Sequence, residues 1–342
     1  MSIFDSSLEP IKRMRRKARE RRLLATREVR EMLERRFGCD PNVFDHSPLS
    51  FRPEVQGAEA SRATEGLNSG VGVLIVHGFT GSPHSMRPVA EHFAALGYPV
   101  EMPLLAGHGT RWLDMRLTTY RDWLSSVESA YLRLAGEGLQ VVVIGLSMGG
   151  TLAVNLSARL PVLGTAIINP YVVDVNPLMR HAGVVSRLLP ALKSVGSDIA
   201  IPGVSEGAYR LTPTASVYQL HLLGAETREL LPRLKAPVLY LRSLGDHTVS
   251  DSSHKYFLEH CSAPVEFRWL TRSYHVATLD YDAEYVLTSL QDFVTAITHD
   301  LPPAPTDCIT PLAQAPYSIP RLPSSRIGAY PVQRSPQPKG PL

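Results

Sequence analysis

The sequence predicts an α/β fold built on a mostly parallel β-sheet with helices on both faces. Short apolar runs rich in Val, Ile and Leu recur through the middle of the chain, and helical patterns separate most of them. Continuously apolar strands are typical of a parallel sheet covered on both faces, and their alternation with helices indicates an α/β architecture. About 44% of the 342 residues are hydrophobic, which is enough for a sizeable buried core.

Composition divides the chain into three regions. Residues 1–65 contain a segment, Ile11 to Phe37, that is dense in Arg, Lys and Glu and has apolar residues at helical spacing. This pattern predicts an amphipathic basic helix followed by a polar linker. Residues 66–300 carry the strand and helix patterns of the predicted α/β domain. Residues 301–342 are rich in proline and are expected to form a disordered tail.

The expected strands of the middle region are its short apolar runs. They cover residues 71–78, 140–147, 164–170, 237–243 and 265–270. The stretch from about 171 to 235 interrupts the alternation of strands and helices, because it holds two helical patterns joined by IPGVSEGAYRLTPT. At least one of these helices must cover the sheet, and the remainder is available as an insertion.

Charge and cysteine content exclude several classes of protein. The net charge of +3 is small for the length of the chain, so nucleic acid is not the expected partner. The three cysteines are far apart and not at metal-ligand spacing, which indicates isolated thiols in a reducing compartment. No apolar run reaches the roughly 18 residues of a membrane span, and no secretory signal follows the basic N-terminus. A cytoplasmic protein is the expectation.

The strongest functional signal is the segment VVVIGLSMGGTLAVNLSARL. It places Gly145, Ser147 and Gly149 at Gly-x-Ser-x-Gly spacing between a predicted strand and a predicted helix, the context of a nucleophile elbow. Such a turn is too tight for flanking side chains, and it projects the serine hydroxyl above the sheet edge. The amides at the start of the helix point to where negative charge develops. Ser147 is therefore the predicted nucleophile.

An oxyanion hole needs two hydrogen-bond donors aimed at the tetrahedral intermediate. The amide of Met148, which follows the nucleophile, is the first candidate, and the second should come from a loop after an earlier strand. The run His77-Gly78-Phe79-Thr80-Gly81 follows such a strand, and the amide of Phe79 is the best placed in it. His77 precedes the nucleophile in the sequence, so a structural role is expected for it.

The acid and the base should follow the nucleophile in the order serine, acid, histidine. Asp246 lies just beyond the strand at 237–243, at the sheet edge where sites form, and is the predicted acid. Asp251 competes with it, but its place in the first turn of a predicted helix suits a capping residue. His275 follows the last strand and is the predicted base. His247, His254 and His260 are less well placed.

These motifs together resemble the carboxylesterase and monoacylglycerol lipase group of the α/β-hydrolases. The resemblance rests on HGFTGSPHSM, PLLAGHGT, GLSMGG, GDHTV and SYHVATLD, and it covers about residues 70–298. It implies an α/β-hydrolase fold with a small helical cap over about 171–235. It also implies a catalytic triad of Ser147, Asp246 and His275, oxyanion donors at Phe79 and Met148, and no metal or organic cofactor. The N-terminal region and the proline-rich tail lie outside the pattern.

The resemblance implies hydrolysis of medium-chain acyl esters or monoacylglycerols. The same triad serves acyl transfer to an alcohol or cleavage of a thioester, and both remain open. A non-catalytic protein on a hydrolase fold also remains open, although the complete triad argues against it. The expected partner is a small acyl ester. A weak peripheral association of the N-terminal helix with an anionic membrane is a further alternative, beside a solvated or packing helix.

The cap sequence leads to an expectation about substrate size. Apolar residues of the two cap segments that do not pack on the domain are expected to form the roof of an acyl pocket opposite Phe79, which predicts a preference for hexanoyl to decanoyl esters. The candidates are Val184, Val185, Leu188, Leu189 and Leu192 in the first segment, and Val217, Leu220, Leu222, Leu223 and Leu230 in the second.

Overall fold

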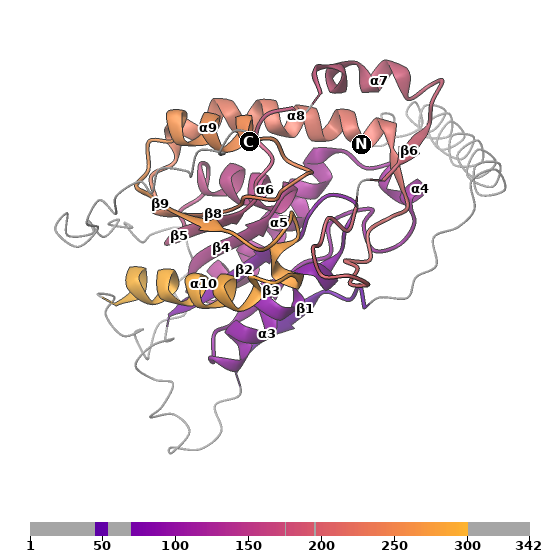
Figure 1. Cartoon of the computed structure of the whole chain (residues 1–342). Helices are drawn as coiled ribbons and strands as arrows, with labels where there is room; N and C mark the ends of the chain where they lie inside the picture. Colours follow the sequence, from indigo (N-terminus) through magenta and orange to yellow (C-terminus); the bar gives the residue numbers. More distant parts are fainter. Residues whose placement is uncertain (1–44, 54–69, 175, 195, 300–342) are drawn as a thin grey trace, which may run out of the picture.

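A computed structural model describes residues 45–53, 70–174, 176–194 and 196–299 of the chain. Its main feature is a seven-stranded sheet in the order β1-β3-β2-β4-β5-β8-β9 (Figure 1). Strand β1 runs antiparallel to β3, and every other neighbouring pair is parallel. This arrangement is the α/β-hydrolase fold that the sequence predicts, with a mostly parallel sheet between helices.

The strands of this sheet are β1 (Leu49–Phe51), β2 (Val71–Val76), β3 (Val100–Met102), β4 (Gln140–Leu146), β5 (Gly164–Ile168), β8 (Val238–Ser243) and β9 (Val265–Leu270). Five of them lie within the ranges predicted from apolar runs. The sequence analysis did not identify β1 and β3, because three residues are too few to show a periodicity.

Helices cover both faces of the sheet (Figure 1). The α-helices of the main domain are α3 (Arg87–Ala95), α4 (Trp112–Met115), α5 (Tyr120–Gly136), α6 (Met148–Ser157), α9 (Asp251–His260) and α10 (Ala283–Thr298), and short 3-10 turns are η1 (Pro83–Met86), η3 (Leu231–Arg233) and η4 (Ala277–Leu279). Buried residues of α5, α6 and α9 form one core cluster, and those of α3 and α10 form the other.

Strand β2 shows why the strands read as unbroken apolar runs. All six of its residues are buried. Leu74 and Val76 pack into the cluster beneath α5 and α6, whereas Val73 and Ile75 pack into the cluster beneath α3 and α10. Because successive side chains of a strand point to opposite faces, a strand between two helical layers must be apolar at every position.

Strand β1 corrects the predicted start of the folded domain at residue 66. Its pairing with β3 places Ser50 opposite Glu101, and the Ser50 hydroxyl donates to Glu101 Oε1 (2.7 Å). Arg52 also donates to Glu101 (2.9 Å), and both groups contribute to lowering the pKa of this buried carboxyl against the raising effect of burial. The segment around 49–52 therefore belongs to the domain, because it closes the edge of the sheet and pairs a buried charge.

The insertion over 171–235 contains a two-stranded sheet as well as helices. It comprises η2 (Pro177–His181), α7 (Ala182–Val185), β6 (Ala191–Lys193), β7 (Leu211–Pro213) and α8 (Thr214–Leu230), with β6 antiparallel to β7. The long helix expected over the first segment thus ends at Val185, and the chain then turns through Pro190 into β6. Helix α8 spans most of the second predicted helix and packs on α6.

The cap residues expected to form an acyl roof take different positions. Leu223 is fully buried, and Leu220 and Leu230 are nearly so; Leu220 and Leu223 belong to the core cluster shared with α6. The whole set from the first segment, Val184, Val185, Leu188, Leu189 and Leu192, is exposed, with Leu188 at 91% of its full accessible surface. These five side chains do not pack on the domain, because the first segment has no long helix to lay them over it, and the acyl roof that they are expected to form stays a prediction.

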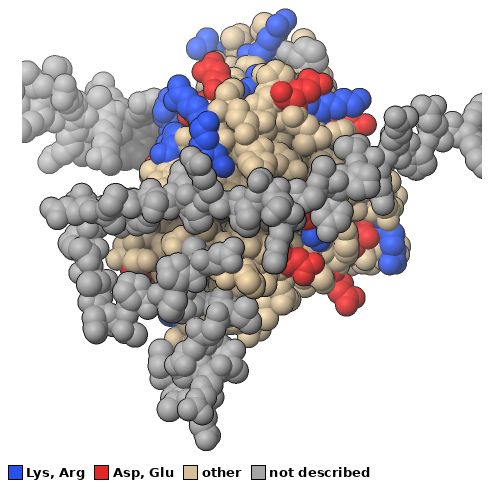
Figure 2. Space-filling model, turned by 90° about the vertical axis from the view of Figure 1, so that its left-hand side faces the viewer, with Lys and Arg blue, Asp and Glu red and all other residues tan. Residues whose placement is uncertain are grey.

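Other expectations fall on residues that the structure does not describe. The basic helix over 11–37 and the proline-rich tail over 301–342 lie outside the described residues. Within the described part, no helix has the length and apolarity to cross a membrane. On the visible part of the face in Figure 2, basic and acidic side chains are interspersed rather than gathered into a field of one sign.

Candidate active site

Ser147 occupies a strained turn between β4 and α6. Its backbone angles are φ 56° and ψ −122°, which is a conformation that residues other than glycine rarely adopt. A Cβ atom at Gly145 would lie 2.2 Å from the Gly149 carbonyl oxygen, and one at Gly149 would lie 2.2 Å from the Val76 carbonyl oxygen. The two flanking glycines are therefore required by backbone contacts, as the sequence pattern predicts for a nucleophile elbow.

The loop after β2 lies directly against Ser147. A Cβ atom built on Gly78 would be 3.4 Å from Ser147 Cβ and 4.0 Å from Ser147 Oγ. In the described part of the chain, the N–H groups of Phe79 and Met148 donate to no protein acceptor. An oxyanion hole needs two unpaired donors, and the assignment of these two amides to it stays a prediction.

Asp246 and His275 are joined at the ends of β8 and β9. His275 Nδ1 lies 3.0 Å from Asp246 Oδ1, and both side chains are buried. The same carboxylate oxygen accepts the backbone N–H groups of Thr248 and Val249, each at 2.9 Å. A histidine held by a carboxylate through Nδ1 keeps Nε2 available for a reacting proton.

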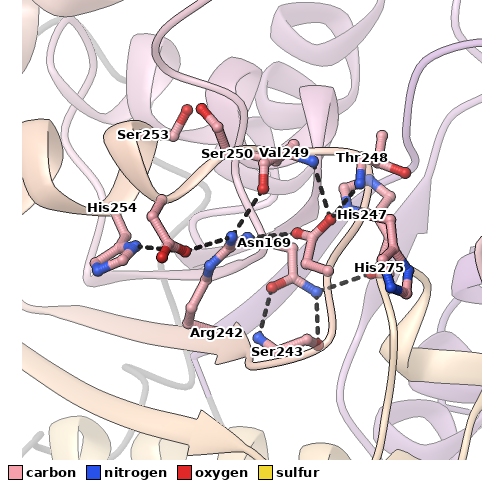
Figure 3. Close-up of polar contacts among 12 residues, drawn as sticks. Asn169, Arg242, Ser243, His247, Thr248, Val249, Ser250, Ser253, His254 and His275 are labelled. Carbon is pink, nitrogen blue, oxygen red and sulfur yellow. Dashed lines mark hydrogen bonds and ion pairs between the residues drawn. The ribbon is translucent and has the colours of Figure 1, made fainter. Parts of the chain in front are cut away.

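Asn169 connects this pair to the strand that supports Ser147. Its side-chain amide donates to the His275 carbonyl oxygen (2.8 Å) and to Ser243 Oγ (2.9 Å), as Figure 3 shows. The preceding residue, Ile168, accepts the backbone N–H of Ser147 (2.8 Å). The backbones of Ser147 and His275 are thus anchored to consecutive residues at the end of β5. Within the described residues the Ser147 hydroxyl makes no hydrogen bond to the protein, which is common before substrate arrives.

The competing carboxylate, Asp251, lies at the first turn of α9, and 69% of its side chain is exposed. It contacts Arg242 (3.2 Å) and not His275. Asp246 is buried by contrast, and burial raises its pKa, but the charge and hydrogen bond of His275, the charge of Arg242 and the Val249 N–H together lower it. The structure therefore brings His275 together with Asp246, the acid predicted from the sequence.

The remaining histidines have other partners. His77 is fully buried; its Nδ1–H donates to the Gly78 carbonyl oxygen (3.0 Å), and its Nε2 accepts the Leu105 N–H (3.2 Å). Burial, assisted by the neighbouring His108, lowers its pKa well below the ordinary value. It is a neutral brace for the loop beside Ser147, in agreement with the structural role expected of it. His247 pairs with Asp198 (2.9 Å), and His254 contacts Asp251 (3.7 Å).

Three charged residues near the site were not identified from the sequence. Arg242 is buried on β8 beside Asp246, and the signal for it was a single charge in the otherwise apolar run PVLYLRS. Asp198 accepts the backbone N–H of His275 (3.3 Å), and Glu206 lies buried between the cap and the loop after β2. The cap residues carried no such signal, because irregular loops have no periodicity.

Glu206 is a buried acid beside the loop after β2. Its Oε1 accepts the Ser197 N–H (2.7 Å), and its Oε2 lies 3.5 Å from where a Cβ of Gly81 would stand. Burial raises the pKa of Glu206, against the lowering effects of the Ser197 N–H and of His275. A carboxyl held towards its protonated form can both donate and accept hydrogen bonds.

The chain is similar to known hydrolases over most of its length. A family model described as the alpha/beta hydrolase family matches residues 73–288. The chain is 43% identical over 243 residues to a thermostable monoacylglycerol lipase of Bacillus sp. (strain H-257), covering 70% of this chain and 96% of that protein. It is 25% identical over 225 residues to a carboxylesterase of Bacillus subtilis (strain 168), covering 65% and 91%.

A solved structure supports the same relationship. It belongs to work on LipS and LipT, two metagenome-derived lipolytic enzymes. It superposes with a TM-score of 0.66 at 35% sequence identity, and the match covers 73% of this chain and 97% of that one. The family match over residues 73–288 contains Ser147, Asp246, His275 and the insertion over 171–235.

Proposed function

The chain belongs to the alpha/beta hydrolase family and is a carboxylic ester hydrolase, and from that premise we propose that it cleaves medium-chain acyl esters, monoacylglycerols among them, through an acyl-enzyme on Ser147. The observation that carries the proposal is the buried Asp246–His275 hydrogen bond at the strand ends beside a strained serine elbow. The fold and the relatives are consistent with this chemistry, and the residue roles are our assignment.

The proposed first step is attack of Ser147 Oγ on the ester carbonyl carbon. His275 Nε2 takes the hydroxyl proton as the new C–O bond forms and then delivers it to the departing alcohol oxygen. Asp246 keeps the other ring nitrogen protonated and stabilises the imidazolium. A water molecule then repeats the sequence on the acyl-enzyme, which releases the carboxylic acid and restores the serine.

The proposed oxyanion hole is the pair of amides at Phe79 and Met148. Both N–H groups lack an acceptor in the described part of the chain, and the second begins a helix whose N-terminal dipole favours negative charge. Loss of a single oxyanion donor costs on the order of 10²–10³ in kcat in enzymes of this type. Because both donors are backbone groups, they need no rearrangement when the intermediate forms.

Glu206 favours an ester whose alcohol part carries further hydroxyl groups. Its carboxyl is buried beside Gly81, close to the proposed oxyanion loop. A buried polar group that meets an apolar alcohol loses hydrogen bonds, whereas a hydroxyl group can satisfy it. This reasoning supports monoacylglycerols over simple alkyl esters as substrates, in line with the similarity of the chain to a monoacylglycerol lipase of Bacillus sp..

A hydrolysis panel tests the proposal. Purified enzyme would be assayed on p-nitrophenyl esters from acetate to palmitate, on monoacylglycerols of the same chain lengths, and on an acyl thioester, each with and without added glycerol. We expect hydrolysis to be fastest for hexanoyl to decanoyl esters and to include monoacylglycerols. Preferential thioester cleavage, or acylglycerol formation in place of free acid, would assign the site to thioesterase or acyltransferase chemistry instead.

A further inference from the structure

The charged side chain of Arg242 lies beneath the proposed acid, inside a strand that is otherwise apolar. Only 2% of its side chain is exposed, and it is among the largest fully buried side chains of the described residues. It is flanked on β8 by Leu241 and Ser243, which are also buried. Burying a guanidinium is costly unless hydrogen bonds and an opposite charge compensate it. The partners of this group therefore indicate what it is for.

Arg242 divides its donors among three acceptors around the turn that carries Asp246. Nη1 donates to Asp246 Oδ2 in a short ion pair. Nη2 donates to the Val249 carbonyl oxygen (2.7 Å) and to Asp251 Oδ1 (3.2 Å). Figure 3 shows the guanidinium of Arg242 at the centre of this group, with dashed lines to its acceptors. The side chain thus fixes both the carboxylate and the loop that presents it.

The two carboxylate oxygens of Asp246 therefore have different hydrogen-bond partners. Oδ1 accepts from His275 and from the backbone amides of Thr248 and Val249. Among the hydrogen bonds of the described residues, Oδ2 receives only the one from Arg242. With its side chain fully buried, the carboxylate would leave Oδ2 without a donor if Arg242 were absent, and it could then rotate away from the geometry that orients His275.

We propose that Arg242 is a positioning residue that holds the Asp246 carboxylate in register with His275 and offsets its negative charge. This inference rests on the proposed function, because it takes Asp246 as the acid of the triad. Arg242 contacts no reacting atom. It acts through Asp246, and it does so from strand β8 rather than from the turn that carries the carboxylate.

The sign of the electrostatic effect follows from the charged groups around the Asp246–His275 pair. Arg242 on β8 pairs with Asp246 and with Asp251 of α9. From the cap, Asp198 binds the backbone of His275 and the charge of Glu206 interacts with His275, and the hydroxyl of Tyr240 is buried nearby. The positive charge of Arg242 offsets the carboxylate and so disfavours a second positive charge on the imidazole. Without it, the site would carry one more net negative charge, so its protonated, inactive form would persist to a higher pH.

The test is the pH dependence of kcat/KM for Arg242→Met, measured on a soluble short-chain ester. We expect kcat to fall by between about tenfold and a hundredfold with KM little changed, and the acidic limb of the profile to move up by about one pH unit. Arg242→Lys keeps a cation in place, and its acidic limb should stay close to that of the wild type even though kcat falls. Arg268→Met is the matched control. Arg268 is an arginine of the neighbouring strand β9, where it lies opposite Leu241 of β8, and it pairs with Glu266 instead of Asp246.

The outcomes separate the inference from the proposed function. Wild-type kcat and an unmoved acidic limb in a folded Arg242→Met variant would overturn the inference, and so would an activity loss with an unmoved limb, which a purely structural role would give. If Arg242→Met does not fold, Arg242→Gln takes its place, with the same criteria. Asp246→Asn is assayed alongside: full activity in that variant would overturn the proposed function itself.

Discussion

His275 Nδ1 meets Asp246 Oδ1 at 3.0 Å although the two residues are 29 positions apart in the chain. The ends of β8 and β9 bring them together, since these strands are parallel neighbours and both residues follow the carboxyl ends. Parallel strands place the loops after them at one edge of the sheet. The same edge carries the serine after β4 and the glycine loop after β2, so one geometric rule assembles the whole candidate site.

Replacing Asp246 by Asn should lower kcat by roughly 10⁴ without unfolding the protein, because an amide presents the wrong partner to the histidine. The Asp251→Asn variant should lose less than about tenfold, since Asp251 is exposed and reaches the site only through Arg242. Steady-state rates and circular dichroism of both variants would be compared with wild type. The reverse ranking would reassign the acid to Asp251.

Glu206→Gln should reduce kcat/KM for a monoacylglycerol more than for a p-nitrophenyl ester of the same acyl chain. The amide keeps the size of the side chain but changes its hydrogen-bonding pattern towards the hydroxyls of the alcohol part. We expect a difference of about tenfold between the two substrates. Equal losses on both substrates would place Glu206 in the support of the loop and not in recognition of the alcohol.

Two truncations should distinguish the contribution of the N-terminal region from that of strand β1 at the sheet edge. Deleting residues 1–43 should leave esterase activity within a few-fold, because every proposed site residue lies beyond them. Deleting residues 1–60 removes β1 and the Arg52 and Ser50 partners of Glu101, and should lower the free energy of unfolding by at least about 1 kcal/mol. Urea denaturation and ester hydrolysis of both truncations would measure this. Equal stability would mean that β1 contributes nothing to the fold.

His108 should make stability depend on pH. Burial lowers its pKa to about 4, against hydrogen bonds to the backbone at Ala106 and Leu105. Between these pH values the unfolded chain binds a proton at His108 and the folded chain does not. The contribution of His108 to the free energy of unfolding is therefore complete above the ordinary histidine pKa of about 6.5 and is lost as the pH falls towards 4.

His108→Asn removes that titration and retains a polar group near the position of Nδ1. Between about pH 7.5 and pH 5, wild type should lose about 2 kcal/mol more of its unfolding free energy than the variant does. Urea titrations at the two pH values give the comparison. Parallel losses in both proteins would show that His108 does not remain neutral in the folded state.

Sequence patterns predicted the parts of this molecule that are repetitive or tightly constrained. The buried strands were predictable as apolar runs, because a sheet that is covered on both faces has mostly apolar residues at every position. The elbow was visible because Gly145 and Gly149 leave no room for a Cβ. Chain order then pointed to Asp246 and His275, which the structure brings together at the ends of β8 and β9.

Features that depend on tertiary contacts were not predictable in the same way. Strand β1 is only three residues long and exists through its pairing with β3. Strand β6 stands where the end of the first helical pattern was expected, because its residues pair with those of β7 about 20 positions further along the chain. Glu206 and Asp198 reach the site from irregular loops, where no period in the sequence indicates a direction. Arg242 is conspicuous in the sequence as the one charge in its strand, but its hydrogen-bond partners depend on the conformation of the turn after β8 and could not be predicted.

The most direct test of the central claim is covalent labelling of Ser147. Wild type and Ser147→Ala would be treated with a fluorophosphonate probe and mapped by peptide mass spectrometry, with Ser129→Ala, an exposed serine of α5, as the matched control. We expect wild type and the control to be labelled at Ser147 alone, and Ser147→Ala to be unlabelled with kcat lowered by on the order of 10⁶. Labelling at another serine, or ester hydrolysis retained in folded Ser147→Ala, would contradict the account.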